Sequence, residues 1–209
     1  MVRWFVLGLL VVLTGCGRGG DEAEKNAKVL RERFAGMGSV CGDPTLIGEA
    51  IGEVEGNGAC GIRNGIRLRA LDGVALSTPA TINCGTARAL KTWINTGARP
   101  AVGGMGGGVS ELKVAASYAC RTRNHKRGAK LSEHSKGNAI DISAVRLVDG
   151  TELSVLNDWR SRDKGAALKQ MHKAACGTFG TTLGPGSDGF HEDHFHYDIA
   201  KHRGGAYCR

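Results

Sequence analysis

The sequence predicts an α+β fold, in which a small antiparallel sheet flanked by helices and stabilised by disulfides carries a metal site. Three observations predict it. Short segments with alternating side chains indicate strands, two longer segments have one apolar helical face, and His and Asp gather in two clusters about fifty residues apart. The chain also contains 7 cysteines, which suggests covalent cross-links.

The predicted strands determine the direction of the polar side chains. Leu112–Tyr118 alternates Leu, Val, Ala and Tyr with Lys, Ala and Ser, and Ala139–Ser143 places Ile140 and Ile142 on one face and Asp141 on the other. Around His194 the chain has the same period of two. We expect these three segments to form an antiparallel core.

Helices are expected to cover this sheet. Thr86–Asn95 has one apolar face and should stop at Gly97, while Ser161–Cys176 has another and should end at Gly177. The Gly-rich stretch from Cys41 to Ser77 has short apolar runs, which predict strands and turns. Gly103–Gly108 lacks the residues that follow a phosphate-binding loop, so we expect a flexible loop or hinge at the edge of a cleft.

The two polar clusters contain the side chains of an open zinc site. They read Ser132-Glu-His134-Ser-Lys-Gly-Asn-Ala-Ile-Asp141 and His191-Glu-Asp-His-Phe-His196-Tyr-Asp198. A hydrolytic zinc site needs about three His, Asp or Glu ligands, an open position for water and a nearby base. His134, Asp141 and His196 can be the ligands. Asp198 or another acceptor would orient a ligand imidazole.

At these positions the chain resembles the zinc peptidases grouped as lysostaphin, D-alanyl-D-alanine metallopeptidases and sonic hedgehog. Their signature, S-x-H-x-x-G-x-A-x-D followed by H-x-D-x-x-H, is filled throughout. The resemblance implies Zn²⁺ bound by His134, Asp141 and His196. It also implies that Asp193 is the catalytic acid/base.

The same resemblance implies that His191 and His194 lie beside the reacting carbonyl. Over a longer stretch, roughly Cys41 to Ala200, the chain resembles the bacterial extensin-like C-terminal family. Ser117-Tyr-Ala-Cys-Arg121, the Ser132 motif and Asp193-His-Phe-His196 carry that likeness.

Substrate capture is expected at Arg121, because D-Ala-D-Ala metallopeptidases have an arginine shortly before the Ser-x-His motif. A guanidinium can hold a carboxylate or carbonyl through two hydrogen bonds. Tyr118 and Ser132, from the same motifs, complete the expected substrate-binding set. Arg121 also begins a basic run, and such runs are mostly solvated surface. The alternative is therefore that Arg121 is a surface residue without a role in substrate binding.

The N-terminus predicts a lipoprotein. Met1–Arg3 is a short positive start, Trp4–Val12 is too short to span a bilayer, and Leu13-Thr-Gly-Cys16 resembles a lipobox. We therefore expect a signal peptide at 1–15 and an acylated Cys16 that anchors the chain in a membrane. A tether at 16–40 would precede a catalytic domain at 41–209. Gly17, rather than Asp, favours the outer membrane, facing the periplasm.

The six other cysteines are even in number, which in an exported chain suggests three disulfides. Sequence alone does not choose among fifteen possible connectivities. These residues are Cys41, Cys60, Cys84, Cys120, Cys176 and Cys208. A bridge at Cys120 would hold the neighbouring Arg121 against the scaffold.

Charge and composition indicate which classes of binding partner to expect. Lys and Arg number 28 against 20 Asp and Glu, a net charge of +8, which favours anionic partners. Nucleic acid is not expected, because aromatics are 5% of residues and no binding motif is present.

The sequence thus predicts a zinc hydrolase that cleaves an amide bond in peptidoglycan peptides, as a carboxypeptidase or endopeptidase. The alternatives are a zinc-containing cell-wall-binding lipoprotein without turnover and a structural disulfide-rich lipoprotein. The sequence indicates neither the bond cleaved nor the oligomeric state.

Overall fold

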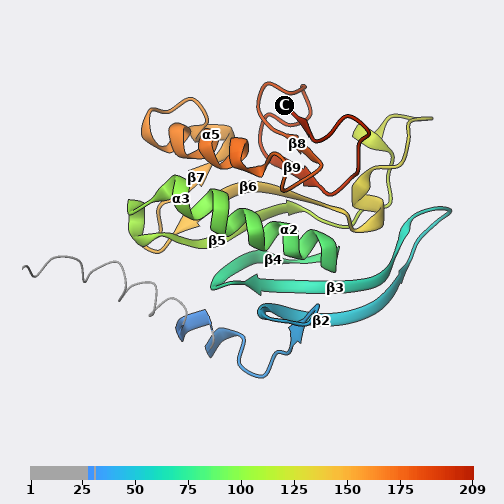
Figure 1. Ribbon diagram of the computed structural model, residues 1–209, viewed down its shortest axis with the longest axis horizontal. Coiled ribbons are helices and arrows are strands. Elements are labelled where there is room, and N and C mark those ends of the chain that lie inside the picture. The colour runs from blue at the N-terminus through green and yellow to red at the C-terminus, as the bar shows by residue number, and fades with distance from the viewer. Residues whose placement is uncertain (1–27, 31) are drawn as a thin grey trace, which may run out of the picture.

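The fold is built on one ten-stranded sheet with helices packed on it (Figure 1). The structure is a computed structural model that describes residues 28–30 and 32–209. The expected signal peptide, Cys16 and the first part of the tether lie outside the described residues. Within the expected tether, residues 28–30 and 32–33 are helical. In the described part of the chain, no helix has the length and apolarity needed to cross a bilayer.

The strands follow the order β1-β2-β3-β4-β5-β6-β9-β8-β10, and β7 pairs with β6. Neighbours run antiparallel except for β4 with β5 and β8 with β10, which are parallel. The α+β class is confirmed. The strands are β1 (Ser39–Val40), β2 (Asp43–Glu55), β3 (Gly61–Leu71), β4 (Val74–Asn83), β5 (Val109–Ala116), β6 (Ala139–Leu147), β7 (Glu152–Ser154), β8 (Thr181–Leu183), β9 (Phe195–Asp198) and β10 (Tyr207–Cys208).

Helices α2, α3 and α5 lie on one face of this sheet (Figure 1). Asn83 caps α2 by accepting a hydrogen bond from Thr86 N–H at 2.9 Å. The helical elements are α2 (Cys84–Trp93), the π-helical turn η1 (Ile94–Ala98), α3 (Arg99–Val102), α4 (Val155–Asp158) and α5 (Asp163–Ala175). Three short 3₁₀ turns are η2 (Met105–Gly107), η3 (Arg123–His125) and η4 (Glu133–Lys136).

Gly97 does not stop the helix, so that prediction is wrong. The chain continues through η1 into α3. A Cβ at Gly97 would lie 2.9 Å from Trp93 Cδ1 and 3.0 Å from Ala174 Cβ. The glycine therefore permits close packing of η1 against α5, which its helix-ending tendency did not reveal.

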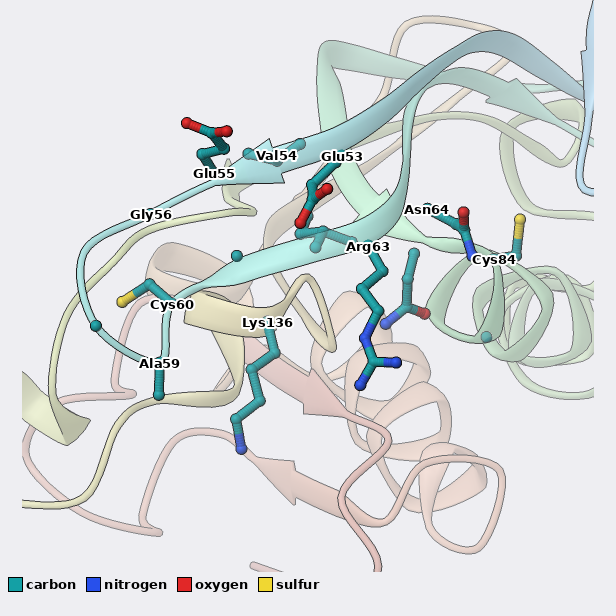
Figure 2. Close-up of a pocket in the computed structure, with 15 residues that line it drawn as sticks. Glu53, Val54, Glu55, Gly56, Ala59, Cys60, Arg63, Asn64, Cys84 and Lys136 are labelled. Carbon is teal, nitrogen blue, oxygen red and sulfur yellow. The ribbon is translucent and has the colours of Figure 1, made fainter.

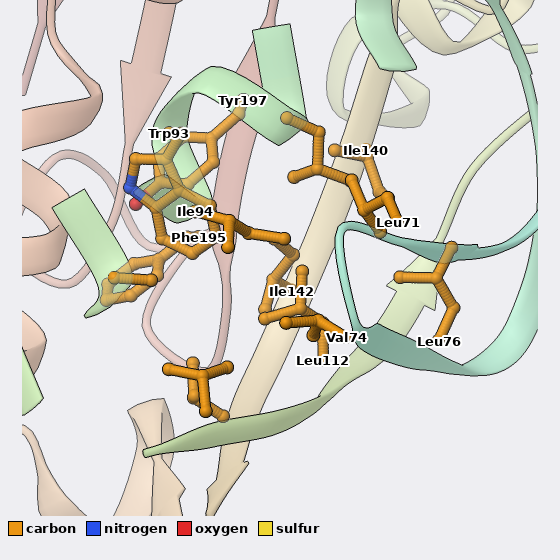
Figure 3. Packing of buried hydrophobic residues seen from close by; sticks show 14 of the residues in the cluster. Leu71, Val74, Leu76, Trp93, Ile94, Leu112, Ile140, Ile142, Phe195 and Tyr197 are labelled. Carbon is orange, nitrogen blue, oxygen red and sulfur yellow. The ribbon is translucent and has the colours of Figure 1, made fainter. Parts of the chain in front are cut away.

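The hydrophobic core lies between the sheet and these helices (Figure 3). Ile140 and Ile142 of β6 are fully buried there with Trp93 and Tyr197, and each such side chain stabilises the fold by roughly 1.5–3 kcal/mol. Because side chains alternate along a strand, this packing turns Asp141 to the opposite face. The core thus aims a carboxylate away from the helices.

Three disulfides connect distant parts of the chain, as the cysteine count predicts. They join Cys41 to Cys84, Cys60 to Cys120, and Cys176 to Cys208. The second attaches the segment before Arg121 to the β2–β3 hairpin. The third attaches β10 to the end of α5, which holds the C-terminal segment beside β8.

The glycine-rich loop is not at the cleft edge, contrary to expectation. A Cβ on Gly106 would lie 2.6 Å from Leu147 Cδ1, and Gly106 C=O accepts from Asp149 N–H at 3.0 Å. Val109 pairs with Leu147, whereas Ala116 pairs with Asp141. The loop therefore packs at the end of β5 opposite Asp141, where close approach requires glycine.

Candidate metal centre

His134 is placed by a tight turn. Ser132 caps η4 by accepting a hydrogen bond from His134 N–H at 3.4 Å. Gly137 ends the turn at φ 65°, and a Cβ there would collide with Ile62. Serine and glycine thus fix both ends of the segment, and the His134 side chain is fully buried.

Asp141 and His196 are placed by strand pairing. They are direct partners in the antiparallel β6–β9 pair, so their side chains share one face. Asp141 Oδ1 lies 2.8 Å from His196 Nδ1 and 3.1 Å from His134 Nε2. His134 Nε2 and His196 Nδ1 are 3.1 Å apart.

These separations fit a zinc ion. Donors about 2.0–2.1 Å from a tetrahedral metal lie roughly 3.3 Å from one another. The three side chains, called here the triad, form one compact group of possible ligands. The ligand set predicted from the sequence is therefore consistent with the geometry.

Hydrogen bonds fix which ring nitrogen each histidine presents. His134 Nδ1 lies 2.5 Å from the Ser117 carbonyl, and His196 Nε2 lies 3.1 Å from Asp198 Oδ2. Both acceptors require a proton on the nitrogen they contact. The opposite nitrogens can then use their lone pairs for a metal, which is the arrangement typical of ligand histidines.

The electrostatics favour a cation at this point. Burial raises the pKa of Asp141, but hydrogen bonds from His134 and His196 outweigh burial and bring this pKa well below its usual range. Burial lowers the pKa of His196, whereas hydrogen bonds to Asp141 and Asp198 raise it to about 9. Asp141 and Asp198 are each 4% exposed. Two buried carboxylates require compensating positive charge, supplied by a proton or a metal.

Asp193 and His194 form a pair next to the triad. Asp193 Oδ1 lies 2.7 Å from His194 Nδ1, and His194 Nε2 lies 3.7 Å from Asp141 Oδ2. The Asp193 side chain is 64% exposed, against 17% for His194. Asp193 therefore reaches the triad through the His194 ring.

His191 forms a second histidine–carboxylate pair. Its Nδ1 lies 2.6 Å from Asp188 Oδ1, and its ring centroid is 5.6 Å from that of His196. Burial lowers the pKa of His191 and outweighs the opposing effect of Asp188. Sequence reasoning missed Asp188, although its place three residues before His191 is a weak signal.

A small cavity of about 230 Å³ opens beside the triad. Arg121 and Ser132 line it together with His191 and His196, which places four expected functional residues in one space. Tyr118 is elsewhere: its hydroxyl faces Gly56, because a Cβ on Gly56 would lie 2.5 Å from that oxygen. The structure therefore does not place Tyr118 among the residues that line this cavity.

A larger groove of about 820 Å³ lies under the β2–β3 hairpin (Figure 2). Arg63 and Lys136 project into it, and the start of α2 forms one wall. Glu133 and Lys136 belong to the same η4 turn but line different spaces. Size alone would favour the groove, but the possible metal ligands line or adjoin the smaller cavity, which we take as the candidate site.

Comparison with known proteins assigns the family. The family model described as the extensin-like protein C-terminus matches residues 45–209. The chain belongs to this family. No curated protein and no solved structure matches the chain significantly.

The extensin-like match contains the whole triad and the surrounding cavity. Of the six paired cysteines, Cys41 alone precedes it. Three disulfides indicate that this extensin-like domain folds in an oxidising, extracytoplasmic compartment.

Proposed function

We propose that this extensin-like protein is a zinc-dependent hydrolase of an amide bond in peptidoglycan peptides, held in the bacterial envelope by a lipid on Cys16. One observation carries the proposal: His134, Asp141 and His196 present donor atoms about 3 Å apart beside a cavity lined by Arg121. The filled peptidase signature supports the reaction class. The expected lipobox and the disulfides support the compartment.

Zinc is the proposed ion because two imidazoles and one carboxylate match its usual catalytic donor set. When bound, it would supply Lewis acidity to the scissile carbonyl and to the attacking water. Ser117 C=O and Asp198 would keep both imidazoles in the binding tautomer. Asp141 would supply the negative charge that offsets part of the ion's charge.

Proton transfer is assigned to Asp193 acting with His194. Asp193 is the proposed acid/base, which takes a proton from water and later gives it to the leaving amine. The 2.7 Å contact with His194 Nδ1 lets the ring carry that proton between the exposed carboxylate and the cavity. The deeper position of His194 relative to Asp193 supports this shared role.

Two further groups would hold the substrate. His191 Nδ1 donates to Asp188, so Nε2 faces away from that carboxylate, and in the protonated ring Nε2–H would donate a hydrogen bond to the developing oxyanion. Arg121 would hold a carboxylate or carbonyl of the peptide through its guanidinium. Ser132 lines the same cavity, but its clearest role is to cap the η4 turn.

The test combines metal analysis with digestion. Untagged protein should bind one zinc ion per chain and release a product from defined muropeptides, detected by mass. His134→Ala, Asp141→Ala and His196→Ala should each abolish zinc binding, while the matched surface variant His125→Ala should keep it. Stoichiometric zinc in a variant that carries all three substitutions would exclude this site, and zinc without turnover would favour the non-catalytic cell-wall-binding alternative.

A further inference from the structure

A strongly basic loop borders the candidate cavity. This basic loop, Arg121–Lys130, contains five Lys or Arg residues and no Asp or Glu. Four of the five are exposed, and Arg121 is half-buried. The loop forms the yellow-green projection on one side of the molecule (Figure 1).

The cations of the basic loop are not paired with carboxylates in the described part of the chain. In residues 28–30 and 32–209, ion pairs form elsewhere, such as Lys91 with Asp43 at 2.7 Å and Arg146 with Glu111 at 2.8 Å. Within the same ranges none of the five loop cations is in an ion pair. Concentrated positive charge of this kind attracts anions.

Local hydrogen bonds hold the basic loop in place. Thr122 and Leu131 form a β-bridge at its base, and Arg123 N–H donates to Lys130 C=O at 2.9 Å. The Cys60–Cys120 disulfide attaches the preceding residue to the hairpin. An ordered loop can present its charges with little loss of conformational entropy on binding.

The basic loop is continuous with the cavity. Arg121 and Arg123 line it beside His191 and His196. The carboxylates that share this lining are already engaged, because Asp188 contacts His191, Asp198 contacts His196, and Glu133 accepts from Asn138. The cations therefore remain available to a ligand.

The size of the cavity shows where the rest of a ligand would lie. At about 230 Å³ it is below the usual range of about 300–1,000 Å³ for pockets that enclose a small molecule, so most of a peptide would lie outside. Phe190, which precedes the lining residue His191, is 51% exposed, and Lys126 Nζ lies 5.5 Å from its ring centroid. The exposed part of the peptide would thus pass over the basic loop.

We propose that the basic loop binds the carboxylates of an anionic peptide whose scissile bond lies in the cavity, so that the preferred substrate is a carboxylate-rich stem peptide. The inference rests on the proposed hydrolase function. It adds substrate selection by Lys126, Arg127 and Lys130, which do not line the cavity. Continuity with the triad favours a peptide over an anionic membrane surface.

The test compares two triple variants with the same change of charge. The loop variant is Lys126→Gln/Arg127→Gln/Lys130→Gln. The control is Arg160→Gln/Lys169→Gln/Lys173→Gln, from exposed positions in and next to α5. The control is closely matched, because Lys169 lies over Trp159 as Lys126 lies over Phe190.

Both sets are measured in an Asp193→Asn background, so that binding is read without turnover. The probes are a fluorescently labelled stem peptide with its carboxylates, the same peptide with those groups amidated, and phosphatidylglycerol vesicles. The loop variant should bind the carboxylated peptide on the order of tenfold more weakly at low salt, and this difference should shrink in high salt. The control variant should bind it like the parent.

Three results would overturn the proposal: equal loss in both variants, equal loss for the amidated peptide, or loss confined to vesicles. The last would indicate a membrane-binding loop. A failure of the proposed hydrolase function can be distinguished from a failure of this inference. In that case the protein with Asp193 intact would not turn over substrate, while the loop and control variants would still differ in their affinity for the carboxylated peptide.

Discussion

Asp198→Asn should weaken zinc binding although the side chain keeps its size. Asp198 is 4% exposed and uses both oxygens: Oδ2 faces His196 Nε2 at 3.1 Å, and Oδ1 accepts from Ala200 N–H at 2.9 Å. An asparagine amide offers only one acceptor oxygen. Whichever way it turns, one of the two donors faces an NH₂ group.

Each orientation carries a cost. If the NH₂ group faces His196, the imidazole proton must move to Nδ1, the nitrogen directed at the metal. If it faces Ala200, a partly buried backbone N–H loses its acceptor, which costs about 1–3 kcal/mol. Loss of such a supporting contact typically reduces metal affinity by about 10- to 100-fold, or about 1.4–2.7 kcal/mol.

Competition with a chromophoric chelator measures the affinity, and thermal unfolding of the zinc-free protein reports the fold. Asp43→Asn is the control, because Asp43 is a carboxylate that pairs with Lys91 rather than with the triad. Wild-type zinc affinity in a folded Asp198→Asn protein would refute the argument that Asp198 sets the tautomer of His196. A matching loss in Asp43→Asn would indicate a general charge effect.

Three further predictions concern catalysis, protons and covalent structure. Asp193→Asn should keep zinc and lose hydrolysis by at least roughly a hundredfold; loss of zinc would make Asp193 a ligand. Since the raised pKa of His196, about 9, means that a proton occupies the metal-free site below that pH, zinc affinity should rise by up to about tenfold per pH unit from neutral towards pH 9. Calorimetry in buffers of different ionisation enthalpy should detect the released proton, and a pH-independent affinity would contradict this. Removing Cys176–Cys208 should cost about 2–5 kcal/mol of unfolding free energy in denaturant titrations, and peptide mapping should find lipid on Cys16.

The sign of the His196 effect on stability follows from the same shift. Its folded pKa lies above the unfolded value near 6.5, so in the metal-free protein its contribution is fully present below about pH 6.5. It is lost as pH rises through about 9. Melting temperatures of chelator-treated protein, compared with zinc-loaded protein across this range, would separate this contribution from that of other groups.

The local sequence pattern was sufficient to predict those features of the site that depend on side-chain direction. Alternation at Ile140, Asp141 and Ile142 predicted which face carries the carboxylate, because apolar burial determines strand orientation. The ligand types followed from zinc chemistry and matched motifs. An even number of cysteines predicted paired thiols without giving their partners.

The three-dimensional fold decided what depends on contacts between distant residues. Pairing of β6 with β9 places Asp141 directly opposite His196, and no local pattern specifies which strands become neighbours. The Ser117 carbonyl at His134 is a backbone group, which any residue type could supply.

Residue chemistry and strand periodicity are local properties, so the donor side chains, the face on which they lie and the presence of cross-links could be predicted from the amino-acid sequence. The disulfide partners, the continuation of the helix through Gly97 and the placement of the Arg121–Lys130 loop beside the cavity became known from the three-dimensional fold. Those features depend on long-range packing, in which the free energy of a residue is set by neighbours far away along the chain.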